Sequence, residues 1–326
     1  GVYAPINDIR LRATYSRAVR SPNINELFQP ETGSFEFIDD PCDPVFIENG
    51  TQYREANCVA ALTALGIDPA TFSPSSDPEA SATILGRSRG NVNLDVEKAR
   101  TWTAGVVVRP SFVPGLSLTA DWYDIKIKDA VNTATAQEVV ELCYDQPTLD
   151  NVFCDSVTRD GDTGFVTDFI TQPENVAAFE TAGLDVNLTY TFEPADLGRF
   201  TARLVGNYLD KLTFVPTLGA DVDDDRGEAF VPKYSGTFDL TWTKDIYTLN
   251  YGLAWQDKTR RYTTEQLEGN PDISDPKYFF YKERWEHDIQ LAIAPSERYS
   301  FYVGVNNFTD EKPAFASTGI PVTALG

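Results

Sequence analysis

Nine stretches of this sequence alternate apolar and polar residues, and this pattern constrains the fold more than any other feature. Successive side chains of a β-strand point to opposite faces, so period-two alternation is typical of a strand with one apolar and one polar face. From Ala182 to Phe192 the even positions are apolar, and the odd positions are Gly, Asp, Asn and Thr. The other copies span Ile9–Arg17, Trp102–Arg109, Leu116–Trp122, Phe200–Tyr208, Tyr234–Trp242, Tyr247–Trp255, Trp285–Ile293 and Tyr299–Asn306.

The length of these stretches points to a membrane. Each is about ten residues long, which is the length that a tilted strand needs to cross the hydrocarbon layer. Aromatic residues lie at both ends of the apolar faces, as in the girdles of membrane barrels. We therefore predict an all-β fold, an antiparallel transmembrane β-barrel; a soluble β-sandwich with bulky core residues is the alternative. After Trp122 the apolar positions shift to Tyr123, Ile125 and Ile127, which predicts a β-bulge or a strand that emerges above the bilayer.

Short and long connections alternate along the chain. Outer-membrane barrels have short periplasmic turns and long extracellular loops, so the first stretch is expected to run outward. Nine strands from an outward start end outside the cell, whereas a single-chain barrel closes with an even number, so we expect at least one further strand. The long loops are expected at about 20–97, 129–173, 216–228 and 259–277.

The net charge of -22 is concentrated in those four loops, which hold 31 acidic and 9 basic residues. A nucleic-acid partner is not expected, because binding phosphates needs clustered Lys and Arg. Acidic loops keep an exposed surface solvated, and they also favour a neutral or cationic ligand over a polyanion. A single histidine, His287, argues against multi-His metal sites and leaves a catalytic triad one candidate imidazole.

The four cysteines lie in the two longest loops, which is typical of a protein from an oxidising compartment. Three pairings are formally open, and we predict the two local ones, Cys42 with Cys58 and Cys143 with Cys154. Metal binding is the alternative, although neither pair has C-x-x-C spacing. A capping box at Thr135 to Glu138 predicts a short helix toward Cys143, and residues 57–65 are candidates for another.

One acidic loop segment is a candidate cation site. Asp221, Asp223 and Asp225 alternate and could offer oxygen ligands to Ca²⁺, but the Gly and Glu of an EF-hand loop are not at the required spacing. A solvated acidic turn is the alternative. No cofactor is otherwise expected.

Several motifs resemble the TonB-dependent outer-membrane receptors. Tyr15–Phe28 is similar to their strand-to-loop signature Y-S-x-x-F-R-x-P-N-x-x-E-L-F. Gly90–Glu97 resembles G-N-P-x-L-x-P-E, with Val92 and Val96 in place of both prolines. Further resemblances lie at Pro114–Ile125 (G-L-x-L-x-x-D-Y-Y-x-I), Phe179–Asp185 (the G-V-E strand opening, with Asp185 for Glu) and Gly304–Pro313 (G-V-x-N-L-x-D-x-x-P).

The resemblance implies a gated transporter rather than an enzyme. Such receptors have an amino-terminal plug inside a barrel of about 22 strands, and a periplasmic TonB protein pulls on the plug to admit a scarce nutrient. By that pattern residues 1–326 are part of the barrel, with its nine strands the thirteenth to twenty-first, and the plug and last strand are expected outside this chain. The implied partners are outer-membrane lipid, the plug, TonB and a small nutrient ligand.

The loop charge favours a neutral oligosaccharide as the nutrient; a ferric siderophore or cobalamin is the alternative within the family, and a passive porin or a soluble carbohydrate-binding protein are alternatives of other classes. Loop aromatics are candidates for stacking on a ligand, although packing inside the loops would also explain them. These candidates are Phe28, Phe35, Phe37, Tyr53, Tyr144, Phe153 and Phe165. Charged residues expected to face the lumen or the plug are Arg109, Asp185, Arg203, Asp239, Glu286 and Asp288.

Overall fold

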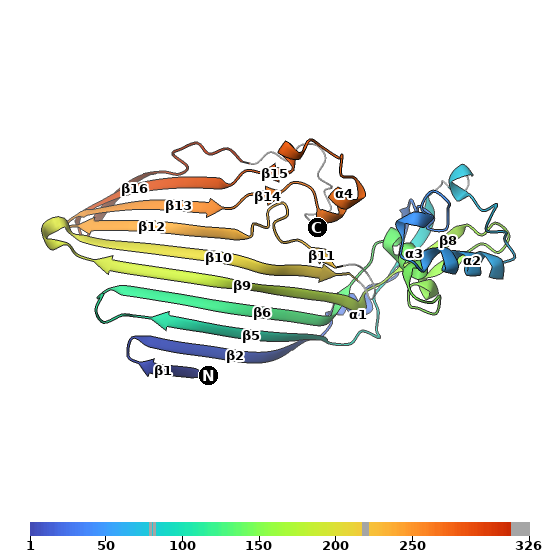
Figure 1. Ribbon diagram of the computed structural model, residues 1–326, viewed down its shortest axis with the longest axis horizontal. Coiled ribbons are helices and arrows are strands. Elements are labelled where there is room, and N and C mark those ends of the chain that lie inside the picture. The colour runs from blue at the N-terminus through green and yellow to red at the C-terminus, as the bar shows by residue number, and fades with distance from the viewer. Residues whose placement is uncertain (78–79, 81–82, 217–221, 314–326) are drawn as a thin grey trace.

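A computed structural model describes residues 1–77, 80, 83–216 and 222–313. Its main feature is one large antiparallel sheet in which each strand pairs with the next strand along its path (Figure 1). The described strands leave this sheet open, with β1 and β17 at its edges. In order they are β1 (Val2–Ile6), β2 (Ile9–Arg20), β5 (Glu97–Val108), β6 (Leu116–Asn132), β9 (Glu174–Phe192), β10 (Arg199–Val215), β12 (Tyr234–Lys244), β13 (Tyr247–Gln256), β16 (Arg284–Ser296) and β17 (Tyr299–Val305).

All nine alternating stretches lie in strands of this sheet, which confirms the predicted antiparallel β fold. The β-sandwich alternative is wrong, because the four-stranded sheet of the described residues lies beyond the strand ends instead of covering the large one, and their other small sheet has only two short strands (Figure 1). The sequence pattern missed β1, which pairs Tyr3 with Leu11 of β2. Val2–Ile6 is short, contains Pro5 and does not alternate, so periodicity gives no signal there.

Three strands continue well past the alternating stretches. β6, β9 and β10 are 17, 19 and 17 residues long, nearly twice the length that the bilayer requires. β6 pairs with β9 in unbroken register from Leu116 to Ile127, so no bulge accompanies the phase change after Trp122. Emergence of the strand above the bilayer therefore explains why Ile125 and Ile127 share a face with the polar positions below them.

Aromatic pairs mark both ends of the apolar face. At the long-loop end, Trp255 and Trp285 lie 5.6 Å apart between ring centroids, and Tyr208 and Tyr234 lie 5.0 Å apart. At the short-turn end, Phe192 stacks on Phe200 at 5.2 Å. These neighbours sit directly opposite each other in adjacent strands, the arrangement in which cross-strand side chains meet. The apolar face thus has two aromatic borders, as the sequence predicted.

The two longest connections fold together into a loop module at the far end of the sheet (Figure 1). A four-stranded sheet in the order β3-β4-β8-β7 packs with α3, and α2 packs on α3. The predicted helices are confirmed: Thr135 caps α3 with Glu138 in a capping box, and α2 covers most of 57–65. The elements are β3 (Thr32–Glu36), η1 (Ile47–Asn49), α2 (Arg54–Ala64), η2 (Pro74–Ser76), β4 (Ile84–Ser88), α3 (Ala136–Asp145), η3 (Cys154–Ser156), β7 (Val157–Arg159) and β8 (Val166–Thr171).

The remaining connections carry short elements. Within the described residues no helix has the length and apolar character to cross a membrane. The elements are α1 (Ile24–Phe28), η4 (Ala195–Leu197), β11 (Asp223–Asp224), β14 (Thr259–Arg260), α4 (Thr264–Gly269), η5 (Pro276–Tyr278) and β15 (Phe280–Tyr281).

Candidate ligand-binding site

Both predicted disulfides are confirmed, and they organise the loop module. Cys42–Cys58 ties the segment before η1 to α2, and Cys143–Cys154 ties α3 to η3. Three of the four half-cystines are almost fully buried and belong to one core with Leu62, Phe72 and Val139. The module therefore has its own cross-linked core at the long-loop end of the sheet.

A buried ion pair joins the two long loops across this core. Arg159 donates from Nη1 and Nη2 to the two oxygens of Asp40 at 2.6 and 2.7 Å, and both side chains are at most 7% exposed. Its Nε donates to the Tyr144 hydroxyl at 2.6 Å. Burial alone would lower the pKa of Arg159, but the hydrogen bonds and charge of Asp40 outweigh burial and raise it. The guanidinium of Arg159 is therefore kept charged, and its two hydrogen bonds to Asp40 have the bidentate fork geometry of strong charge-assisted pairs.

A second ion pair fixes α2 against the end of α3. Arg54, which is buried, donates from Nε to Oδ1 of Asp145 at 2.8 Å and from Nη2 to Oδ2 at 2.5 Å. The same carboxylate accepts the backbone N–H of Thr51 at 3.0 Å. The carbonyl of Asp145, which has no helical partner at the end of α3, accepts the Thr51 hydroxyl at 2.8 Å.

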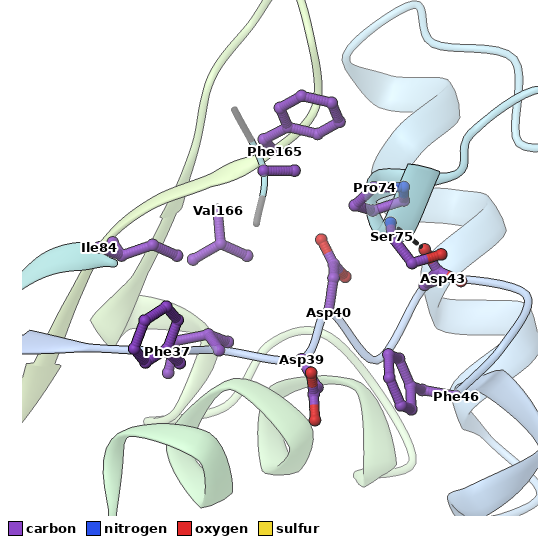
Figure 2. A pocket seen from close by; sticks show the side chains of 12 residues that line it. Phe37, Asp39, Asp40, Asp43, Phe46, Pro74, Ser75, Ile84, Phe165 and Val166 are labelled. Carbon is purple, nitrogen blue, oxygen red and sulfur yellow. Dashed lines mark hydrogen bonds between the residues drawn. The ribbon is translucent and has the colours of Figure 1, made fainter. Parts of the chain in front are cut away.

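A small cavity of about 200 Å³ opens beside the module core. The phenyl rings of Phe37, Phe46 and Phe165 line it together with Asp40 and Asp43, as Figure 2 shows. Asp43 accepts the backbone N–H of Ser75 at 2.7 Å, and Asp40 holds Arg159, so both carboxylates already have partners. Ligand pockets are commonly about 300–1,000 Å³. The cavity therefore has room for one ring of a ligand, and its lining combines three phenyl rings with aliphatic and acidic side chains.

The candidate stacking aromatics do not form one group. Tyr144 and Phe153 are 3% and 6% exposed in the module core, so packing accounts for both rings. Phe165 is half-buried at the cavity. Phe28 at the end of α1 and Tyr53 before α2 are exposed. Phe37 lines the cavity beside Phe165, and Phe35 is exposed. A ligand contact therefore stays a prediction for these residues and for Phe28 and Tyr53, while Phe46 is a cavity residue that the candidates did not include.

The two loop-boundary motifs meet at the top of β2 and β5. Arg20, the last residue of β2, donates to Glu97 at 2.5 and 2.6 Å and to Glu26 at 3.1 Å. Glu26 also closes a capping box with Asn23 at the start of α1. The exit of the loop is bound to its start as well, since the N–H of Asn91 donates to the carbonyl of Glu26 at 2.8 Å. The motifs thus form a junction that fixes where the longest loop leaves the sheet.

Acidification should loosen this junction. Arg20 lowers the pKa of Glu97 through its hydrogen bonds, and this outweighs the opposing effect of burial. A depressed pKa contributes stability that is present above the ordinary value of about 4.3 and is lost as the pH falls through the lower, folded-state value. We expect hydrogen exchange of the Val131 amide, which donates to Glu97 at 2.8 Å, to accelerate below pH 4 beyond its intrinsic rate. Glu97→Gln should remove that acceleration; an unchanged pH response in this variant would contradict it.

Gly90 allows the closest approach in the junction. A Cβ there would lie 2.6 Å from the backbone nitrogen of Gln29 and 2.7 Å from that of Phe28. Backbone cannot yield as a side chain can, so Gly90→Ala should destabilise the junction by about 1–3 kcal/mol through overpacking. The rate of limited proteolysis in the segment that follows α1 measures this destabilisation. Gly161→Ala is the matched control, because a Cβ at Gly161 has no neighbour within 4 Å; equal cleavage of both variants would contradict the prediction.

The charges expected to face the lumen share the polar face of the sheet. Arg203 lies opposite Asp239, and Asp239 and Asp288 flank Gly252. Asp185 accepts a hydrogen bond from Asn207 at 2.7 Å, Arg109 donates to Ser117 at 3.3 Å, and Glu286 pairs with Arg284. The prediction omitted the pair of Arg12 with Asp121, which spans β5 where Gly105 leaves room. Alternation in Ile9–Arg17 would have placed Arg12 on this face. Contact with a plug stays a prediction for all of them.

The candidate Ca²⁺ site is not assembled by the described residues. Asp221 lies outside them, and Asp223 belongs to β11, where it pairs with Phe214 of β10. No group of three or more His, Cys, Asp or Glu side chains in the described parts of the chain is placed to hold a metal. Calcium binding stays a prediction.

Comparison with known proteins identifies the family. Residues 1–308 match the model of the TonB dependent receptor-like β-barrel. No curated protein matches the chain. A mutant of the ferric enterobactin receptor of Pseudomonas aeruginosa in complex with enterobactin is 16% identical with a TM-score of 0.57, over 97% of this chain and 35% of that one. The siderophore receptor PirA of Acinetobacter baumannii is 14% identical with a TM-score of 0.53, over 95% of this chain and 36% of that one.

These two likenesses show the fold, and the chain spans about a third of the length of either receptor. The family match covers nearly the whole chain, including the alternating strands, the loop junction and the loop module described above. The chain therefore belongs to the family of TonB-dependent receptors, which are β-barrel proteins of the bacterial outer membrane.

Proposed function

We propose that this chain supplies part of the barrel wall and the extracellular loops of a receptor that imports a ferric siderophore. The observation that carries the proposal is the structural likeness to siderophore receptors over 95–97% of the chain, loops included. Transport is coupled to energy through a plug and a periplasmic TonB protein, the partners that family membership implies. The chain's own part is to present the loop module outward and to line a polar passage. No bond is made or broken in this function.

The oligosaccharide preferred from the sequence has no support in the comparisons. That preference was based on the net charge of the loops, which includes side chains that do not meet a ligand. Asp40, Asp145 and Glu97 form ion pairs with Arg159, Arg54 and Arg20, and Asp43 accepts backbone N–H groups. These pairs leave the net charge of the loops unchanged, but they take four carboxylates out of the set that could contact a ligand.

Aromatic surface in the module suits a siderophore with aromatic chelating rings. Phe37, Phe46 and Phe165 line a cavity with room for one ring, and ring pairs gain about 0.5–1.5 kcal/mol beyond area burial. Because the cavity is smaller than a whole chelate, the rest of the ligand would lie outside it, between the module and the polar face of the sheet.

Iron uptake tests the proposal. The receptor is expressed from its complete reading frame in an outer-membrane host that lacks its own siderophore receptors, and radiolabelled ferric enterobactin and maltodextrin are offered separately. We expect energy-dependent iron uptake that stops when the proton-motive force is collapsed, and no maltodextrin uptake. Phe165→Ala should weaken binding, and Phe112→Ala, an exposed aromatic in a short turn, is the matched control. Maltodextrin uptake without iron uptake would overturn the proposal, and uptake that persists without the proton-motive force would favour a passive porin.

A further inference from the structure

Basic side chains gather on the outer face of the sheet just above its long-loop aromatic border. In adjacent strands Arg17, Arg100 and Lys126 lie directly opposite one another, and two residues further out Lys98 lies opposite Lys128. Cross-strand partners share a face, as do positions two apart in one strand. Tyr15 and Trp102, whose rings lie 4.4 Å apart, are two residues below Arg17 and Arg100 on that face. The row therefore continues the lipid-facing side of β2, β5 and β6.

The height of this row coincides with the lipid headgroups. Two residues of a strand span about 7 Å along its axis, and less along the membrane normal when the strand is tilted. The headgroup layer on each side of the hydrocarbon core is about 5–8 Å thick. Trp102, 53% exposed, marks the boundary of the hydrocarbon, as interfacial aromatics do. The basic row thus stands at the level of the polar headgroups of the outer leaflet.

Protein partners neutralise only part of this row. Glu180 forms ion pairs with both Lys126 and Lys211, at 2.9 and 3.0 Å, and Asp129 forms one with Lys98 at 2.9 Å. Asp124 lies opposite Trp102 on the same face, and Asp210, next to Lys211, accepts a hydrogen bond from the Tyr208 hydroxyl at 3.0 Å. The side chains of Arg100 and Lys128 are exposed and make no hydrogen bond or ion pair with any residue that the structure describes. Six cations, including Arg17 and Lys211, thus stand beside these four carboxylates in a protein whose net charge is -22.

Without a bound anion, this row of neighbouring cations destabilises the folded sheet. Like charges directly opposite each other in a sheet are destabilising, and here Arg17 faces Arg100, Arg100 faces Lys126, and Lys98 faces Lys128. A phosphate monoester carries nearly two negative charges, and Arg binds it with paired N–H donors. A phosphorylated headgroup anchored by acyl chains would place its phosphate on the row and its chains along Trp102 and the apolar positions below. We propose that this basic row binds the phosphorylated headgroup of an outer-leaflet lipid.

The test compares lipids that differ only in phosphate. The receptor, purified from its complete reading frame in detergent, is titrated with lipid A and with chemically dephosphorylated lipid A, and bound lipid is counted by native mass spectrometry. We expect lipid A to bind and the dephosphorylated lipid to bind at least tenfold more weakly. Each basic residue near an anionic membrane surface contributes on the order of fivefold in affinity, so Arg100→Gln with Lys128→Gln should weaken lipid A about thirtyfold.

The matched control removes two exposed charges elsewhere, Lys282→Gln with Arg298→Gln, and should leave lipid A affinity unchanged. Arg100→Lys keeps the charge, so it should reduce the affinity for lipid A less than Arg100→Gln does. Gel mobility before and after heating verifies that each barrel is folded, and ferric enterobactin binding on the same samples should not change. Equal affinity for both lipids, or equal affinity of the row and control variants, would overturn the proposal. So would inorganic phosphate that competes as well as lipid A, because a free anion would then be the occupant.

Discussion

Replacing Arg159 with methionine is expected to unfold the extracellular loop module while the barrel strands stay folded. The substitution leaves Asp40 as a buried charge without its partner, and removes the donor to the Tyr144 hydroxyl and to the carbonyl of Gly164. Breaking a buried ion pair by removing one partner costs about 3–5 kcal/mol. That cost falls on a module with a small core of its own, so local unfolding is the expected response.

Hydrogen exchange by mass spectrometry on the receptor in detergent measures this effect. Amides of α2 and α3 should lose protection, and amides of β9 and β10 should keep it. Arg199→Met is the matched control, because its ion pair with Glu193 is exposed and such pairs contribute about 0–1 kcal/mol. Combining Asp40→Leu with Arg159→Met should restore much of the protection, since an apolar pair leaves no buried charge. Unchanged exchange in the single variant would show that the module does not depend on this pair.

The sheet was largely predictable because the alternation of apolar and polar residues along a strand follows from the different surroundings of its two faces. In β12, Phe238, Leu240 and Trp242 each have a polar neighbour on either side, and the bilayer imposes that alternation along the crossing. Where the environment changes, the pattern changes too, as after Trp122, although the sequence alone left a bulge and emergence above the bilayer equally open. Only register settled the matter, because Ile125 and Ile127 keep pairing with Thr181 and Phe179.

The candidate site was less predictable because its contacts join distant residues. Arg159 and Asp40 are 119 residues apart, and nothing in either local sequence marks one as the partner of the other. Tyr144 and Phe153 resemble exposed loop aromatics until the fold places them in a core. Cysteines were the exception, because a covalent pair must close a local loop or cross the sheet, and local spacing favoured one answer. Loop charge favoured an oligosaccharide, which the comparisons do not support, because a net charge does not specify which side chains line a site.

An arginine at Leu204 should destabilise the barrel far more than an arginine at its neighbour Val205. Leu204 lies midway along the apolar face of β10, between the borders at Phe200 and Tyr208, and is 43% exposed toward the lipid side. Val205 pairs with Asn187 and Thr237 on the polar face. Arginine on the lipid face near the bilayer midplane costs about 2–4 kcal/mol, whereas lumen positions tolerate charge.

Both substitutions replace an aliphatic residue in the same strand by the same cation, so strand propensity and net charge are matched. They differ in the solvent that the guanidinium meets. Urea unfolding of the receptor in lipid vesicles should show a lower midpoint for Leu204→Arg and a value near the parent for Val205→Arg, with similar slopes. If Val205→Arg were the more damaging change, the apolar face would pack against protein and the polar face would meet lipid. Equal midpoints would mean that both faces meet the same environment. That result would contradict a barrel with lipid on one face of the strand and a polar lumen on the other.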